Sequence, residues 1–256
     1  MIKSDIDFCF FSGTGNTAVC VSAMAAVFRQ GDVVVRTRPI EDTDPASLPP
    51  GGILGLACPA AAFTTYPLVW RFFRNLPPSG GRSAFLLVTM SRSTMGLVGP
   101  LRQHLKHLGY KVLGARRIVM PSNFLKRRTD PERDAALVRR GIEKSESFAR
   151  DLMQGTSSWP RVPLLSDLAC LLLGNDRPFS FMRRKLPLEA DRSVCTGCGL
   201  CAEHCPVRNI RMRDFPQHLD RCELCMRCQG ICPVNAVTVG GRKYIQRQTT
   251  ARPWEA

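Results

Sequence analysis

Eight of the twelve cysteines in this chain fall into two runs with identical spacing, and this repeat constrains the fold more than any other feature. The first run reads CTGCGLCAEHCP over residues 195–206, and the second reads CELCMRCQGICP over residues 222–233. Each cysteine and the closing proline of the first run recur 27 residues later, so the unit is an internal duplication. The eight cysteines are Cys195, Cys198, Cys201, Cys205, Cys222, Cys225, Cys228 and Cys232.

The expected compartment decides between disulfides and metal as the role of these cysteines. The first residues, MIKSDIDFCFF, show no basic stretch followed by an apolar run, so we expect no secretory signal and a cytoplasmic location. Disulfides are rare in that compartment, which favours metal binding by a small cysteine-dense domain. The other cysteines stand singly in apolar surroundings and are expected to be small buried hydrophobic residues. They are Cys9, Cys20, Cys58 and Cys170.

Two metal chemistries use cysteines in such patterns. Three thiolates with two residues between neighbours can wrap a loop around three irons of a four-iron cluster, while the fourth iron takes a thiolate from further along the chain. Structural zinc sites also use four cysteines, but usually as two CxxC pairs with a longer spacer. The third cysteine of each run and the repeated Cys-Pro therefore favour iron–sulfur clusters, and zinc is the alternative. Proline lacks an N–H and fixes φ, so it can end each loop.

The segment Asp191 to Gly240 resembles bacterial-type 2[4Fe-4S] ferredoxins, because it matches all eight cysteines and both prolines. In those proteins the fourth cysteine of each run binds the cluster of the other run. The resemblance implies two [4Fe-4S] clusters, one on Cys195, Cys198, Cys201 and Cys232, the other on Cys222, Cys225, Cys228 and Cys205. Free ferredoxins of this type are commonly acidic, whereas this segment carries Arg192, Arg208, Arg211, Arg213, Arg221 and Arg227. These arginines suggest a different docking partner and should raise the cluster potentials.

A second motif lies near the N-terminus, where residues 6–17 read IDFCFFSGTGNT. The apolar run suits a buried strand, and AVCVSAMAAVF after it suits a helix. At such a turn, unpaired backbone N–H groups and the helix dipole form an anion site. Without the Walker lysine and the third Rossmann glycine, neither nucleoside triphosphate hydrolysis nor dinucleotide binding is favoured. The loop comprises Ser12, Gly13, Thr14, Gly15, Asn16 and Thr17.

The loop sequence S-G-T-G-N-T resembles the FMN phosphate loop of flavodoxins, (T/S)-x-T-G-x-T. In flavodoxins two later loops hold the flavin ring, which implies residues 59–64 and 91–95 here. Phe63 and Tyr66 are the nearest aromatic residues, and the second loop offers Arg92 in place of an aromatic one. A positive group there would stabilise the reduced flavin, and a solvated surface charge is the alternative. The expected ring contacts are Pro59, Ala60, Phe63, Ser91, Arg92 and Ser93.

The remaining N-terminal sequence alternates between strands and helices. Apolar runs predict strands at 51–59, 83–90 and 111–121. Helical patterns cover 63–76, 96–109 and 131–155. This alternation predicts an α/β fold, a flavodoxin-like doubly wound parallel sheet whose ligands lie at the carboxyl ends of the strands. A small α+β, ferredoxin-like two-cluster domain is expected to follow it.

The order of these parts resembles a family of bacterial and archaeal flavodoxin–ferredoxin fusion proteins, often called EFR-type ferredoxins. Members also show Met-Pro-x-Asn-(Tyr/Phe), present here at residues 120–124. The expected domains are an FMN-binding flavodoxin-like domain (1–154), a linker with a short apolar helix (155–190), the two-cluster domain (191–240) and a basic tail (241–256). The resemblance implies electron transfer between two clusters, FMN and an external redox partner. An FMN-dependent reductase with a small substrate is the alternative, and no catalytic residue is assigned.

A net charge of +15 prompts a search for anionic partners. Two clusters and a flavin phosphate would reduce this charge to roughly +9. The basic residues are scattered and only three Tyr and three Trp are present, so no stacking platform for nucleic acid is expected. An acidic ferredoxin, reductase or acceptor enzyme is the favoured partner. Residues 162–174 are too short to span a membrane and should form a linker helix, with interfacial membrane contact as the alternative.

Overall fold

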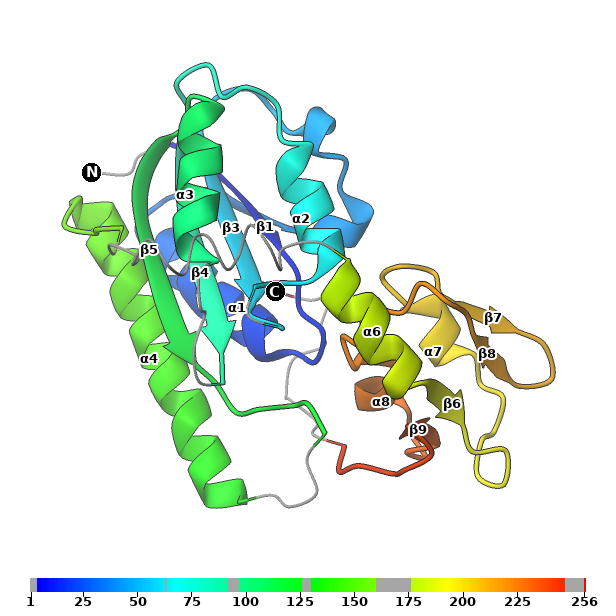
Figure 1. The fold of residues 1–256 in the computed structure, drawn as a ribbon. Coiled ribbons are helices and arrows are strands. Elements are labelled where there is room, and N and C mark those ends of the chain that lie inside the picture. Colours follow the sequence, from blue (N-terminus) through cyan, green and yellow to red (C-terminus); the bar gives the residue numbers. More distant parts are fainter. Residues whose placement is uncertain (1–3, 63, 92–96, 126–129, 160–175, 247–255) are drawn as a thin grey trace.

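The computed structural model describes residues 4–62, 64–91, 97–125, 130–159, 176–246 and 256. A five-stranded sheet with helices on both faces forms the larger part, and a module of short strands and helices lies beside it (Figure 1). The larger part contains β1 (Ile6–Phe10), α1 (Asn16–Gln30), β2 (Val35–Pro39), two 3-10 turns (Ile40–Asp42 and Pro45–Ser47), β3 (Ile53–Pro59), α2 (Pro67–Arg74), β4 (Ser83–Met90), α3 (Val98–His107), β5 (Lys111–Val119) and α4 (Pro131–Gln154).

All five strands are parallel and follow the order β2-β1-β3-β4-β5. This is the flavodoxin-like order of doubly wound sheets, so the predicted fold class is confirmed for this part. The sequence analysis missed the edge strand β2. Its Arg36 and Arg38 donate to the buried Asp7 of β1 at 3.3 and 2.9 Å, and these charges interrupt the apolar run that signals a strand.

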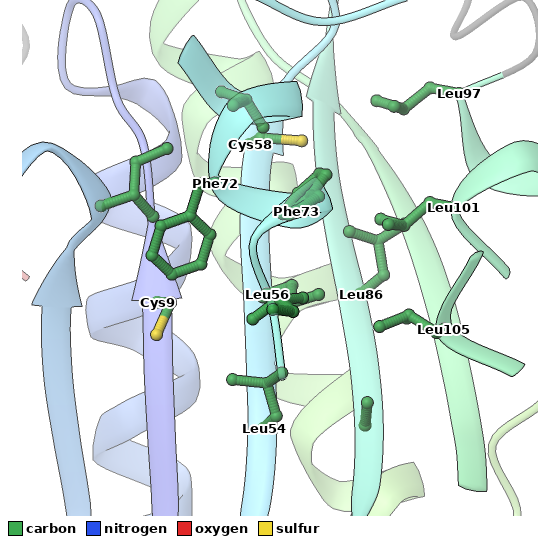
Figure 2. Packing of buried hydrophobic residues seen from close by; sticks show 14 of the residues in the cluster. Cys9, Leu54, Leu56, Cys58, Phe72, Phe73, Leu86, Leu97, Leu101 and Leu105 are labelled. Carbon is green, nitrogen blue, oxygen red and sulfur yellow. The ribbon is translucent and has the colours of Figure 1, made fainter. Parts of the chain in front are cut away.

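Alternate side chains of the strands enter two separate cores, because successive residues of a strand point to opposite faces. Leu54 and Leu56 of β3 pack with α2 and α3 on one face, as Figure 2 shows. Phe8 and Phe85 pack with α1 and α4 on the other face. The sheet is therefore buried on both sides, and its binding residues must lie at the strand ends.

The prediction that the single cysteines are core residues is confirmed where they are described. Cys9, Cys20 and Cys58 are buried, and burial raises the pKa of their thiols to about 12, 11 and 12. They therefore behave as small apolar side chains. Cys170 lies outside the described residues.

The start and end of α4 follow the capping signals in the sequence. The side chain of Asp130 accepts a hydrogen bond from the Arg133 amide at 3.0 Å, and Pro131 occupies the first turn. At the other end Gly155 adopts a left-handed φ of 75°, which glycine reaches without strain. The observed helix agrees with the predicted one to within a residue.

The smaller part is an α+β module with its own apolar core. Its elements are α6 (Arg177–Lys185), β6 (Leu188–Ala190), α7 (Leu200–Glu203), β7 (Ile210–Met212), β8 (Pro216–His218), α8 (Arg227–Ile231) and β9 (Val237–Val239). The strands form two antiparallel pairs, β6 with β9 and β7 with β8. β6 belongs to the segment expected as linker, and the domain boundaries stay predictions.

The apolar helix expected over residues 162–174 lies outside the described residues. Among the helices that are described, none is both long and apolar enough to cross a membrane.

Candidate metal and nucleotide sites

The first cysteine run forms a loop around a small pocket. Cys195, Cys198 and Cys201 line this pocket together with Cys232, which ends the second run. Cys198 is exposed, whereas the other three are half-buried. The structure therefore brings together the four thiols expected to bind one cluster, which we call the first quartet.

Cys205 leaves the first run and lies with the second. Burial raises the pKa of the Cys228 thiol well above its ordinary value, and the nearby thiols of Cys225, Cys222, Cys205 and Cys201 raise it further. Cys205 also raises the pKa of Cys222 and of Cys225, after the larger effect of burial. Cys205 therefore lies near the first three cysteines of the second run, and we call Cys205, Cys222, Cys225 and Cys228 the second quartet. Metal coordination removes the thiol protons.

The internal duplication extends to the hydrogen bonds of the sulfur atoms. The Asn209 amide donates to Cys205 Sγ at 3.2 Å, and the Ala236 amide, 27 residues later, donates to Cys232 Sγ at the same distance. An N–H directed at sulfur stabilises a thiolate, and such bonds tune cluster potentials. The fourth cysteine of each run thus accepts an equivalent amide hydrogen bond, which favours its thiolate form.

The spacing of the thiols bears on the choice between zinc and iron. Over the described parts of the chain, no three Cys, His, Asp or Glu side chains converge closely enough to hold a single ion. Zinc needs its sulfur ligands at about 2.3 Å from one centre, whereas each iron of a four-iron cluster takes its own thiolate. Each quartet offers the four thiolates that one such cluster requires.

The loop between β1 and α1 is held open by its own side chain. Ser12 Oγ accepts hydrogen bonds from the amides of Gly15 at 3.1 Å and Ala18 at 3.4 Å. Gly15 is the N-cap of α1 with a φ of 97°, and it has no side chain to cap the first turn. With the Ala18 amide taken up by Ser12, the amides of Asn16 and Thr17 are left for an anion. Thr17 Oγ1 shares a 2.8 Å hydrogen bond with Thr89 Oγ1 of β4.

Residues that follow β5 close the side of this loop. Asn16 Nδ2 donates to the Pro121 carbonyl at 2.8 Å, and Asn123 Nδ2 donates to Thr14 Oγ1. The Oδ1 atoms of Asn16 and Asn123 are buried, and neither has a hydrogen-bond partner within the described structure. Buried polar atoms of this kind call for a ligand or water. The Met-Pro-x-Asn-Phe stretch thus contributes to the loop's pocket.

The pocket has a volume of about 120 Å³, and five of the six loop residues line it. Pro59, Ala60 and Ser91, expected near a flavin ring, line it as well, together with Tyr66 and Phe124. This volume suits a phosphate-sized group, because sites for larger small molecules usually begin at about 300 Å³. The donor set therefore fits the phosphate end of a flavin nucleotide. Gly15, the sixth loop residue, shapes the helix start instead.

The other residues expected around the flavin ring lie outside the described residues. They are Phe63, Arg92 and Ser93.

The phosphate loop and the second quartet meet at one surface. Cys225 and Met226 line the same pocket as the loop. Gly13 packs so closely against the Cys225 carbonyl that a Cβ at position 13 would clash with it. Burial, followed by the nearby Cys225 and Glu223, raises the pKa of the Tyr66 hydroxyl. The two candidate sites are therefore adjacent.

One charged residue of the second run has a different position from the expected one. Arg227 was grouped with the arginines that would dock a partner, but it is only 3% exposed. It is covered because it forms an ion pair with Glu41 at 2.5 Å beneath the phosphate loop. Glu41 and the buried Glu223 were not predicted as site residues, since no local pattern marks a carboxylate whose partner is distant in sequence.

Comparisons with known proteins agree with this division of the chain. Residues 194–236 match the family model described as a 4Fe-4S dicluster domain. No curated protein gives a significant match.

Solved structures resemble the N-terminal part. The flavodoxin of Megasphaera elsdenii in its two-electron reduced form is 22% identical, with a TM-score of 0.42 over 54% of this chain and 98% of that one. Oxidised flavodoxin 2 from Bacillus cereus is 12% identical, with a TM-score of 0.47 over 59% and 99%. Rubredoxin oxygen:oxidoreductase from Desulfovibrio gigas is 11% identical, with a TM-score of 0.44 over 61% of this chain and 38% of that one. The strand order and the dicluster match establish a fusion of flavodoxin-like and ferredoxin-type parts.

Proposed function

We propose that this chain is an electron-transfer protein in which two [4Fe-4S] clusters and FMN exchange electrons with an external redox partner. The observation that carries this proposal is that Cys225, a member of the second quartet, lines the same pocket as the phosphate loop. Clusters carry single electrons and flavins carry one or two, so adjacent sites let one chain convert between the two modes. Tethering them also makes their encounter intramolecular.

The proposed cluster ligands are the two crossed quartets. The first quartet, Cys195, Cys198, Cys201 and Cys232, surrounds the pocket near the exposed end of the module. The second quartet, Cys205, Cys222, Cys225 and Cys228, lies against the sheet.

The proposed FMN site uses the open amides of α1 for the phosphate. Ser12 keeps the loop in shape through its two amide contacts, and Asn16 and Asn123 supply polar side chains at the rim. Tyr66 and Phe124 are the described aromatic residues that line the pocket. Either ring offers an apolar surface to an isoalloxazine.

The exposure of the cysteines indicates which quartet faces the external redox partner. Cys198 is exposed, whereas Cys228 is buried. The first quartet is therefore the proposed contact with the external partner, and the second quartet connects it to the flavin. Exposed arginines surround this end of the module, among them Arg192, Arg211 and Arg213. Their charge favours an acidic redox protein.

The reductase alternative gains no support from the described pocket. We therefore keep electron transfer as the single proposed function.

Anaerobic purification tests the proposal directly. We expect about eight irons and one FMN per chain, together with an EPR spectrum of two spin-coupled clusters after reduction. A colourless protein that contains zinc would contradict the iron–sulfur assignment. Iron without flavin would leave a ferredoxin and remove the nucleotide half of the proposal.

A further inference from the structure

We infer that Glu223 and Arg227 are positioning residues that hold the second quartet against the nucleotide pocket. They flank Cys225 by two residues on either side. The inference rests on the proposed function, because it explains which cluster faces the flavin. It assigns to two charged side chains a role that the cysteine spacing alone does not predict.

Glu223 connects the second run to α2. Its side chain is 4% exposed, and Oε2 accepts a hydrogen bond from the Leu68 amide at 2.9 Å. Leu68 lies in the first turn of α2, where backbone amides lack helical partners and a carboxylate is favoured by the helix dipole. Oε1 accepts a second hydrogen bond from Arg71 at 2.9 Å. Glu223 therefore caps a helix of the other part of the chain.

Arg227 connects the second run to the phosphate loop itself. Its guanidinium donates to the Ser12 carbonyl at 2.8 Å and pairs with Glu41, which follows β2, at 2.5 Å. The same group lies 5.3 Å from the centre of the Phe11 ring, within the range of a cation–π contact. A further hydrogen bond, of 3.3 Å, reaches the carbonyl of His204 at the end of the first run. One side chain thus joins both runs to β1 and its loop.

These two attachments determine the position of Cys225. Glu223 fixes the chain on the α2 side and Arg227 fixes it on the α1 side, so the residue between them cannot move away from Gly13 without breaking a buried contact. At the equivalent positions of the first run stand Thr196 and Leu200, which carry no charge. Only the second run therefore carries the two attachments through Glu223 and Arg227, which together we call the clasp.

The test uses the full-length chain with iron and FMN bound, and variants that remove one attachment at a time. Glu223→Ala should speed hydrogen exchange at the Leu68 amide by about ten-fold or more, since a charged hydrogen bond is lost. Arg227→Gln should do the same for the loop at residues 12–17. In both variants, electron transfer from the clusters to the flavin after photoreduction should slow by about ten-fold or more, because part of the effective concentration is lost.

Arg140→Gln is the matched control, because it removes the same charge from an exposed position of α4, away from both candidate sites. It should leave both the exchange pattern and the transfer rate unchanged. Glu223→Gln should restore part of the Leu68 protection, since an amide oxygen can still accept the hydrogen bond.

Glu41→Gln keeps the test decisive if Arg227→Gln fails to retain iron. It breaks the same ion pair from the sheet side and leaves the cysteine run unaltered. Variants that keep iron and FMN and show parental exchange and parental transfer would overturn the inference. A parental chain without cluster-to-flavin transfer would instead overturn the proposed function, and the exchange data would still decide whether the clasp exists.

Discussion

The two cysteine runs share their spacing and their backbone turns but differ in their surroundings. The first run exposes Cys198, whereas the second run buries Cys228. The first run contacts solvent, and the second packs against the core beneath α2 and α3, where Cys225 joins the apolar cluster. The duplicated unit therefore supplies one outward and one inward candidate metal site.

The turns of the two runs have the same left-handed backbone, but different residues adopt it. Gly197 and Gly199 adopt left-handed φ values of 69° and 80°, and their counterparts Leu224 and Met226 adopt 55° and 60°. Bulky residues are rare in this region because Cβ crowds the backbone. Leu224 and Met226 are 2% and 3% exposed, so their buried side chains offset the strain.

The largest expected effect separates the ligands of the two quartets. Cys205→Ala should remove the cluster of the second run, and Cys232→Ala that of the first, so each variant should hold about four irons. Iron analysis and EPR would check this. Loss of the cluster from the run that carries the mutation would show that the quartets are not crossed.

The next effect compares a buried ion pair with an exposed one. Glu41→Gln should lower the free energy of unfolding by about 3–5 kcal/mol, because it leaves Arg227 charged and buried. Glu203 of the first run is exposed and lies 3.9 Å from His204, a contact that is an ion pair only when His204 is protonated, so Glu203→Gln should cost about 0–1 kcal/mol. Anaerobic urea titrations measure both. Equal losses of unfolding free energy in the two variants would contradict the conclusion that a buried ion pair holds the second run in place.

A decrease in pH should change the protonation of His218, which precedes the second run, but not that of Asp191, which precedes the first. Burial holds the pKa of His218, four residues before Cys222, at about 4, below its ordinary 6.5. The unfolded chain then binds more protons between these values, so the free energy of unfolding should fall as the pH decreases from 6.5 to 4, by about 2–3 kcal/mol. Asp191, four residues before Cys195, has a pKa lowered to about 2 by Lys243 and Ser193 and stays charged throughout this range.

A variant isolates the His218 contribution. Both ring nitrogens of His218 are buried and have no hydrogen-bond partner in the described structure, so His218→Phe should be tolerated. Unfolding curves of the variant should lose this part of the pH dependence. An unchanged slope would show that His218 is not the titrating group.

A further small effect concerns the left-handed glycines. A Cβ at Gly199 meets no neighbouring atom, so Gly199→Ala should cost only the backbone strain, about 1–2 kcal/mol. Met226→Gly would relieve similar strain but leave a cavity, so it should cost more than Gly199→Ala. Thermal unfolding measures the stability of both variants. If Gly199→Ala were the more destabilising, burial of the Met226 side chain would not offset its backbone strain.

The sequence allowed prediction of the sites whose residues are close together in the chain. The phosphate loop and the cysteine runs are local, so spacing alone restricts what they can bind. The crossing of Cys205 and Cys232 followed from a resemblance and stays a prediction; Cys232 lines the pocket of the first run, and Cys205 lies near the cysteines of the second run. The clasp could not be predicted in this way. Glu223 meets Leu68 across 155 residues, and only the packing of the two parts decides that contact.

β2 illustrates a second limit of sequence patterns. Its arginines are paired with the carboxylates of Asp7 on the neighbouring strand and of Asp5, which precedes that strand. A strand stabilised by such pairs at a sheet edge has no apolar alternation, so hydrophobic periodicity does not detect it.

The pairing of β6 with β9 has an evolutionary consequence. Leu188 lies opposite Val239, so the first and last strands of the small module lie side by side. Units whose ends emerge together can be inserted into other proteins without disturbing the host fold. A gene segment that encodes this module could thus be transferred as a cassette, and only its contact residues would have to adapt to the new host.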